Sequence, residues 1–384
     1  MFAAFLIAGV LCVAIWAYLL LAHGHFWSVP FPPSCPAAPA ASRSPSGSVA
    51  VIVPARNEVE VIGRAVSSLI RQNYSGAIHV FVVDDNSTDG TAEEARRAAE
   101  AATDRLMVIQ GRPLPAGWSG KLWAVQQGVE QAMALEPDFL LLTDADVEHT
   151  SDNVGCLVGI AESGSFDIAS FMVKLHCRGL AERLLIPAFV FFFFMLYPPE
   201  WIRDGRRKTA GAAGGCILLR PAALKRMGGI AAIRGEIIDD CALARAVKHS
   251  GGKVWLGMTA DTHSVRPYTS FGEIERMISR TAFNQLQHSF WLLLGTLVGM
   301  LLIYILPLAL IASGSAKLAA AGVLAFALMA SAYLPMVRFY GLNALWALTL
   351  PFSAGFYTYA TVLSAVKYWS GRGGEWKGRA QDVS

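Results

Sequence analysis

The chain has 384 residues, of which 54% are hydrophobic and only 16% are charged. Soluble globular domains carry roughly 25% charged residues, so the composition excludes a chain that lies entirely in water. The net charge of +3 is too small to favour binding to DNA or RNA, and no nucleic-acid partner is expected.

The N-terminal region predicts a membrane anchor followed by a linker. Residues 2–21 are apolar and uncharged, and they lack the basic start of a cleaved signal peptide, so a retained anchor over residues 1–22 is favoured. Residues 23–48 are predicted to form a linker, because the stretch from Ser28 to Ser48 contains six prolines and little that could pack.

From Val49 onward, apolar runs alternate with helical patterns. The runs "VAVIVP" (49–54), "HVFVVDD" (79–85), "RLMVIQG" (105–111) and "DFLLLTDAD" (138–146) predict four strands. Helices are expected between them, the first with apolar residues at helical spacing from Ile62 to Ile70. This alternation predicts an α/β, Rossmann-like and mostly parallel sheet with helices on both faces.

Two acidic pairs end two of these predicted strands. Asp84 and Asp85 follow one strand, and Asp144 and Asp146 follow another. Ligands of parallel sheets bind beyond the carboxyl ends of the strands. Either pair alone could be an ordinary solvated turn, but both together favour a binding site. The Asp144–Asp146 spacing suits a hard divalent cation, Mg²⁺ or Mn²⁺.

A third acidic pair, Asp239 and Asp240, precedes a predicted helix that Gly251 ends. One interpretation is helix capping. The other is a general base, because a helix N-terminus favours the ionised carboxylate that accepts a proton from an attacking hydroxyl.

An apolar segment follows Arg183. Its uncharged block, residues 184–196, is predicted to be too short for a simple span. Residues 184–202 are therefore expected to form an interfacial or re-entrant element, with Tyr197 and Trp201 at the membrane interface and basic residues on lipid headgroups. A buried core helix is the alternative. An apolar surface beside the site favours an acceptor that arrives from the membrane.

The C-terminal region predicts three membrane helices within residues 289–366. The uncharged stretches are 291–312, 318–337 and 342–366, each near the 20 residues that a span requires. Residues 367–384 form a basic tail, which three spans would leave outside the cytoplasm, against the usual charge bias. The six cysteines show no metal-binding spacing and are expected to be reduced.

Four motifs in order resemble those of the family 2 glycosyltransferases, which have the GT-A fold. They are "VIVPARNE", "VVDDNSTDGT", "TDAD" and "DDCALARAVKHSGG", and the likeness covers residues 49–282. A "P-x-GW-x-GK-x-WA" segment at residues 115–124 and the membrane helices resemble the hopene-associated glycosyltransferases of bacterial hopanoid biosynthesis.

The resemblance implies a role for each candidate residue. Asp240 would be the catalytic base, beside Asp239, and Asp146 with Asp144 would bind the metal. Arg280 would contact the diphosphate, or would instead be an interfacial cation. The implied donor-binding residues are Pro54, Ala55, Arg56, Glu58, Asp85, Lys121, Asp144 and Arg280.

The implied function is metal-assisted, inverting transfer of a sugar from a nucleotide sugar, expected to be a UDP-sugar, to a hopanoid or polyisoprenoid type of lipid. The protein would lie in the bacterial inner membrane as a multi-pass protein, with its catalytic domain facing the cytoplasm. A processive polysaccharide synthase is one alternative, disfavoured because Thr281 stands where such enzymes carry Trp. A catalytically silent membrane scaffold is another.

Overall fold

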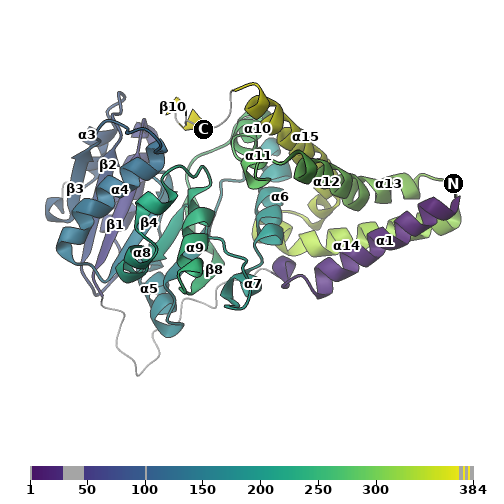
Figure 1. Cartoon of the computed structure of the whole chain (residues 1–384), viewed down its shortest axis with the longest axis horizontal. Helices are drawn as coiled ribbons and strands as arrows, with labels where there is room; N and C mark the ends of the chain where they lie inside the picture. The colour runs from purple at the N-terminus through teal and green to yellow at the C-terminus, as the bar shows by residue number, and fades with distance from the viewer. Residues whose placement is uncertain (1, 29–46, 100–101, 372–374, 377–378, 381–384) are drawn as a thin grey trace. The chain divides into compact units, whose positions relative to one another are not determined.

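The computed structural model describes residues 2–28, 47–99, 102–371, 375–376 and 379–380 (Figure 1). The chain forms two compact units. We call them the sheet unit (Pro30–His176, Trp201–Arg266 and Gly374–Ser384) and the helical unit (Met1–Val29, Cys177–Glu200 and Pro267–Gly373). Residues 177–200 and 267–282, which the sequence placed in the catalytic region, thus pack in the helical unit.

The sheet unit contains an eight-stranded sheet in the order β3-β2-β1-β4-β7-β6-β8-β5. The first four strands in this order run parallel, β7 runs antiparallel to both neighbours, β6 and β8 are parallel, and β5 is antiparallel to β8. The predicted α/β, mostly parallel sheet is therefore confirmed. The strands are β1 (Val49–Ala55), β2 (Ile78–Asp84), β3 (Leu106–Gln110), β4 (Phe139–Thr143), β5 (Val147–Glu148), β6 (Ile168–Lys174), β7 (Cys216–Leu219) and β8 (Val254–Ser264).

Helices cover both faces of this sheet (Figure 1). Helices α2, α3 and α5 pack on one face through the alternate residues of β1 and β2. Helix α4 packs on the other, where a Cβ at Gly128 would lie 2.6 Å from Ile52. The helices are α2 (Val59–Ile70), α3 (Thr91–Ala98), α4 (Gly120–Ala132), α5 (Asn153–Ser163), α7 (Pro199–Arg203), α8 (Pro221–Arg226) and α9 (Asp239–His249), with the short turns η2 (Thr103–Arg105), η3 (Met133–Leu135) and η4 (Ile230–Ile233).

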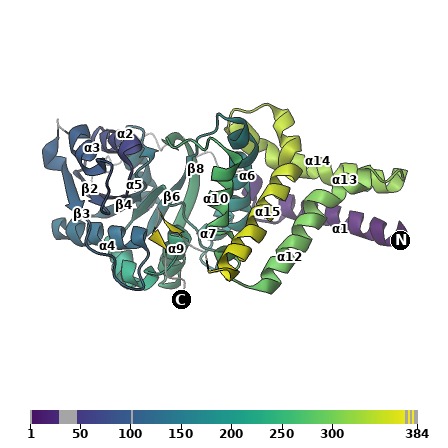
Figure 2. The same ribbon diagram turned by 90° about the horizontal axis from the view of Figure 1, so that it is seen from above.

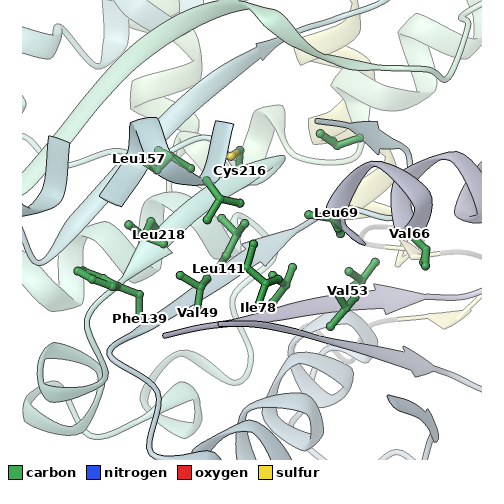
Figure 3. Close-up of a cluster of buried hydrophobic side chains, with 14 of the residues drawn as sticks. Val49, Val53, Val66, Leu69, Ile78, Phe139, Leu141, Leu157, Cys216 and Leu218 are labelled. Carbon is green, nitrogen blue, oxygen red and sulfur yellow. The ribbon is translucent and has the colours of Figure 1, made fainter. Parts of the chain in front are cut away.

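The main core of this unit lies between the sheet and α2, α3 and α5 (Figure 3). Val53 of β1, Val66 and Leu69 of α2, and Leu157 of α5 are fully buried there. Since β1 is buried on both faces, its sequence is a continuous apolar run, as is typical of a central parallel strand.

In the helical unit, α1 packs along α14 (Figures 1 and 2). The indole of Trp16 donates to the carbonyl of Ile303 over 3.1 Å. Pro307, four residues later, has no N–H to donate to that carbonyl, so the indole provides a hydrogen bond there. The elements are α1 (Phe2–Leu21), η1 (Phe26–Ser28), α6 (Leu180–Leu196), α10 (Phe271–Ser279), α11 (Ala282–Gln285), α12 (Phe290–Met300), η5 (Leu301–Ile305), α13 (Leu306–Ile311), α14 (Ala316–Phe339), η6 (Ala344–Thr349) and α15 (Leu350–Trp369).

Four helices among the described residues are long and apolar enough to cross a membrane. They are Phe2–Leu21, Leu180–Arg203, Phe290–Ile311 and Ala316–Phe339. The first, third and fourth match predicted spans.

Two predictions about the membrane segments need correction. The sequence predicts that the apolar block 184–196 is too short to span, but its helix begins at Leu180 and the apolar helical segment continues to Arg203. The charged Glu182 hid the start of the helix in the sequence, and it is buried because it accepts backbone hydrogen bonds from Arg178, Gly179 and Tyr268. In the predicted span 342–366, the structure has the short helix η6 followed by α15. Helix α15 is not among the four candidate membrane helices.

Some predictions fall on parts of the chain that the structure does not describe. Residues 29–46 of the predicted linker, and most of the basic tail beyond residue 371, lie outside the described residues. Among the described cysteines, Cys12, Cys177, Cys216 and Cys241 are free as expected. Cys156 is in a disulfide, which corrects the expectation for that residue.

Candidate active site

The acidic motifs meet at one edge of the sheet. Strand β1 pairs in parallel with both β2 and β4, so the three strands end on the same side. Asp85 follows β2 and Asp144 follows β4. The carboxyl ends of neighbouring parallel strands are the usual ligand site of an open α/β sheet.

The turns after β1 and β2 are joined by hydrogen bonds. Arg56 donates from Nη1 to the backbone oxygen of Asp85 over 2.5 Å, and the same nitrogen lies 3.7 Å from the Asp85 carboxylate. The Asp85 side chain is only 1% exposed. The backbone N–H of Asn57 donates to the Ser87 hydroxyl over 2.9 Å. Two motifs that lie about thirty residues apart therefore form one rigid wall.

Lys121 forms ion pairs with two acidic motifs. Its Nζ atom lies 2.9 Å from Oδ1 of Asp144 and 3.1 Å from Oδ2 of Asp239. Burial alone lowers the pKa of an ammonium group, but the negative charges of Asp144 and Asp239 outweigh burial and raise the pKa of Lys121. Burial raises the pKa of Asp144, and the charge of Lys121 opposes that rise.

Helix α4 places Lys121 at this point because its N-terminus is held on two sides. The Ser119 side chain caps the helix by accepting from the N–H of Leu122 over 3.4 Å. The backbone N–H of Ser119 donates to the carbonyl of Arg234 over 2.8 Å, which ties the start of α4 to the segment before α9. Lys121 thus points toward the first turn of α9.

Asp240 lies in the first turn of α9 and accepts two backbone hydrogen bonds. Oδ2 accepts from Gly214 N–H over 2.8 Å, and Oδ1 accepts from Cys241 N–H over 2.7 Å. Burial and the neighbouring negative charge of Asp239 nevertheless raise the pKa of Asp240 to about 6. The carboxylate is therefore ionised at pH 7 and is basic enough to accept a proton.

Asp146 has partners that the sequence did not indicate. Its Oδ2 atom accepts from the Ser264 hydroxyl over 2.9 Å and from Nε of Arg266 over 3.3 Å. Arg266 also forms an ion pair with Glu58. Ser264 and Arg266 reach Asp146 because β8 pairs with β5, with Val147 opposite Ser264.

The acidic residues suit a metal only if a substrate completes its coordination. Within the described parts of the chain, no group of three or more His, Cys, Asp or Glu side chains lies together as a metal site. Asp144 and Asp146 offer carboxylate oxygens, which are the ligands that Mg²⁺ and Mn²⁺ prefer. Mg²⁺ is usually held by one or two carboxylates, waters and substrate phosphates, so the residues present fit that kind of site.

A buried histidine contacts Thr143, the residue that precedes Asp144. The His149 side chain is 4% exposed and lies 2.9 Å from the Thr143 hydroxyl and 2.8 Å from the amide of Asn153. Thr143, which precedes Asp144, donates its hydroxyl to the carbonyl of Gly215 over 2.7 Å. Burial lowers the pKa of His149 to about 3, so the ring is neutral. His149 is not among the site residues predicted from the sequence.

A pocket brings five of the eleven predicted site residues together. Pro54, Lys121, Asp144, Asp239 and Asp240 line it, with Gly214 at its wall. Ala55 is buried at the end of β1, beside them. Arg280 belongs to the helical unit, where it is exposed just after α10, so its predicted contact with a diphosphate stays a prediction.

Part of the chain matches a known protein family. Residues 50–228 match the family model described as Glycosyl transferase family 2. The match covers a little under half of the chain and indicates a family 2 glycosyltransferase domain in this region.

The chain is also similar to particular proteins. It is 37% identical over 100 residues to 4,4'-diaponeurosporenoate glycosyltransferase of Staphylococcus aureus (strain bovine RF122 / ET3-1), covering 26% of this chain and 24% of the relative. A second relative of that name, from strain USA300, is 37% identical over 97 residues, covering 25% of this chain and 23% of the relative. The match thus spans about a quarter of the length of these relatives.

A solved structure shares the fold. It is the mannosyltransferase PcManGT from Pyrobaculum calidifontis in complex with GDP-Man and Mn²⁺. It is 17% identical to this chain, has a TM-score of 0.55, and the alignment covers 95% of this chain and 99% of that one.

Proposed function

We propose that this protein is a membrane-bound glycosyltransferase that moves a sugar from a nucleotide sugar, of the UDP-sugar class, to a lipid of hopanoid or polyisoprenoid type. The observation that carries the proposal is the position of Asp240. This basic carboxylate, hydrogen-bonded to Gly214, lines the same pocket as Lys121 and Asp144. A proton acceptor and a phosphate-binding group thus share one pocket.

The nucleotide is assigned to the ends of β1 and β2. Asp85 accepts hydrogen bonds from the uracil and ribose, and the adjoining residues of β1 form the wall around them. Arg56 fixes Asp85 by contacting both its backbone oxygen and its carboxylate. The residues proposed around the nucleotide are Pro54, Ala55, Arg56 and Glu58.

The diphosphate is assigned to Lys121 and to a divalent cation, Mg²⁺ or Mn²⁺, held by Asp144 and Asp146. When bound, this cation supplies positive charge to the departing nucleoside diphosphate. Lys121 remains charged at neutral pH, because Asp144 and Asp239 raise its pKa, and it adds a second positive charge.

The transfer step uses Asp240 as the general base. Asp240 takes the proton from the acceptor hydroxyl, the acceptor oxygen bonds to the anomeric carbon, and the bond from that carbon to the diphosphate breaks with its electron pair on the leaving oxygen. Direct displacement in this way inverts the anomeric carbon. Asp239 keeps Lys121 beside the reacting groups through its 3.1 Å ion pair.

Two observations support a lipid acceptor. Four described helices are long and apolar enough to cross a membrane, which indicates membrane association. Two similar proteins are named for action on 4,4'-diaponeurosporenoate. We assign the protein to the bacterial inner membrane, with the active site facing the cytoplasm, where nucleotide sugars are available.

The test uses membranes that contain the full-length protein, with Mg²⁺ or Mn²⁺ and a panel of labelled UDP-sugars and GDP-mannose. The label is followed after extraction with organic solvent. The Asp240→Asn variant removes the base, and Asp104→Asn is the matched control, because Asp104 is an exposed residue of η2.

We expect the label to enter the organic phase with the wild type and with Asp104→Asn. With Asp240→Asn the label should not enter this phase. Label in a precipitable polymer would instead favour a polysaccharide synthase. No transfer from any donor in the panel, to any phase, would contradict the proposed function.

A further inference from the structure

Each of the two carboxylates proposed for the metal is held by a cation of the protein itself. Lys121 lies 2.9 Å from Asp144, and Nε of Arg266 lies 3.3 Å from Asp146. The two cations differ in their surroundings. Lys121 is bound by Asp144 and Asp239, whereas Arg266 also pairs with Glu58, from the nucleotide side of the site.

The backbone around Arg266 is fixed, while its side chain extends into the site. The N–H of Val265 donates to the carbonyl of Asp146 over 2.8 Å, and the N–H of Arg266 donates to the Ser264 hydroxyl over 3.3 Å. The Arg266 side chain is 34% exposed, more than that of Glu58 at 10%. The guanidinium can therefore change partners without any movement of β8.

Charge balance gives a reason for such a change. Acidic side chains outnumber basic ones at the site, so a divalent cation is attracted, but a cation on Asp146 and the guanidinium of Arg266 repel each other. A bound diphosphate offers new oxygen acceptors to the displaced guanidinium. The acidic residues are Glu58, Asp85, Asp144, Asp146, Asp239 and Asp240, and the basic ones are Arg56, Lys121 and Arg266.

We propose that Arg266 is an exchangeable counter-ion of the donor site. Without donor it bridges Asp146 and Glu58 and keeps both carboxylates in position. When the cation and the donor bind, it leaves Asp146 and pairs with the diphosphate. This inference rests on the proposed function, because it requires the metal and the diphosphate to bind at Asp144 and Asp146.

The proposal predicts effects of opposite sign on two ligands. Replacing Arg266 with Gln removes the charge that competes with the metal, so Mn²⁺ should bind more tightly in the absence of nucleotide. The same change removes a partner of the diphosphate, so UDP should bind more weakly in the presence of Mn²⁺. One nearby charge in a partly exposed site corresponds to about tenfold in each affinity. Arg266→Lys should restore both affinities in part.

The experiment measures both affinities on the detergent-solubilised full-length protein, without acceptor. Free Mn²⁺ is followed by electron paramagnetic resonance, and UDP binding by calorimetry at saturating Mn²⁺. The matched control is Arg64→Gln, because Arg64 is an exposed residue of α2 whose ion pair is with Glu148 of β5 and not with Asp144 or Asp146. This control should bind both ligands as the wild type does.

Opposite shifts for Arg266→Gln, with an unchanged Arg64→Gln control, would support the proposal. A merely structural role would weaken both affinities together, and that result, or no change in either, would overturn it. If the wild type itself bound neither Mn²⁺ nor UDP, the proposed donor site would fail and this inference with it. The proposed function survives if the wild type binds both and only the Arg266 shifts are missing.

Discussion

The backbone N–H of Gly214 donates to Oδ2 of Asp240 over 2.8 Å, and a Cβ added to Gly214 would lie 3.3 Å from that oxygen. The same Cβ would lie 3.5 Å from Nζ of Lys121. The loop before β7 thus approaches the proposed base so closely that a side chain at position 214 would require Asp240 to shift by a few tenths of an ångström.

Gly214→Ala should therefore lower activity without unfolding the protein. The methyl group displaces Asp240 or Lys121 by a few tenths of an ångström, and we expect about a tenfold loss in kcat. Steady-state kinetics and thermal unfolding of the same preparation check this. Gly205→Ala is the control, since nothing lies within 4 Å of a Cβ there. Equal activities of the two variants would argue against close positioning by Gly214.

The pKa of Asp240, raised to about 6 by burial and by Asp239, predicts an acid limb in the pH–rate profile. Because the base must be ionised, log kcat/KM should fall with a slope of about one below pH 6. The residual activity of Asp240→Asn should lack that limb. An acid limb near pH 4 in the wild type would contradict the raised pKa of Asp240.

The same pKa has a consequence for stability. The folded protein binds this proton more tightly than the unfolded chain, so the protonated carboxyl stabilises the fold below about pH 4, and this contribution is lost as the pH rises through about 6. Asp240→Asn should therefore raise the melting temperature at pH 7.5. A variant that melts lower than the wild type at that pH would contradict this reasoning.

The contribution of His149 to folding stability should depend on pH in the opposite direction from that of Asp240. Its pKa in the folded protein is lowered to about 3, so below pH 6.5 the unfolded chain takes up a proton that the folded chain does not. This costs about 1.4 kcal/mol of stability for each pH unit between 6.5 and 3. His149→Phe should lose that dependence.

His149→Phe should also be less stable at neutral pH, by about 2 kcal/mol, because Thr143 and Asn153 lose a buried hydrogen-bond partner. Melting temperatures at pH 5 and pH 7.5 test both statements. His249→Phe, at the exposed end of α9, serves as the control. Equal acid sensitivity of the two variants would contradict a buried, neutral His149.

Replacing Lys248 should loosen the segment of chain that its side chain holds in place. Its ammonium donates to the carbonyls of Trp201 and Thr209, over 3.2 and 2.7 Å, and to that of Ile202 over 2.7 Å. It thereby ties the basic segment 203–208 to helix α9. Lys248→Met should speed cleavage of this segment by trypsin at least several-fold, as followed by mass spectrometry. Lys225→Met, on the exposed end of α8, should cleave like the wild type.

Much of the fold could be predicted from local patterns. The four parallel strands β1 to β4 are apolar runs, and helices follow β1, β2 and β3, so the first half of the sheet is evident from the sequence. The antiparallel β7 was not predicted, because its four residues, Cys216–Leu219, follow a glycine-rich segment and show no period. The start of α6 was missed because Glu182 looked like an exposed charge.

Some residues of the candidate site could likewise be predicted from the sequence, and others could not. Asp85, Asp144, Asp146 and Asp240 stand in short motifs directly after strands or before a helix, so their meeting at one edge could be expected. Arg266 could not be found this way, because it reaches Asp146 through the pairing of β5 with β8, over 120 residues of sequence. A lone arginine just after a strand gives no signal until the register of that strand is known.

The most direct test of the account measures the initial rate of sugar transfer into the organic phase by Asp240→Asn membranes, with donor binding measured in parallel. We predict that the variant still binds UDP with Mn²⁺ and that its transfer rate is at least a hundredfold below those of the wild type and of Asp104→Asn. Transfer by Asp240→Asn at the wild-type rate would contradict the central claim that this carboxylate accepts the proton of a lipid hydroxyl.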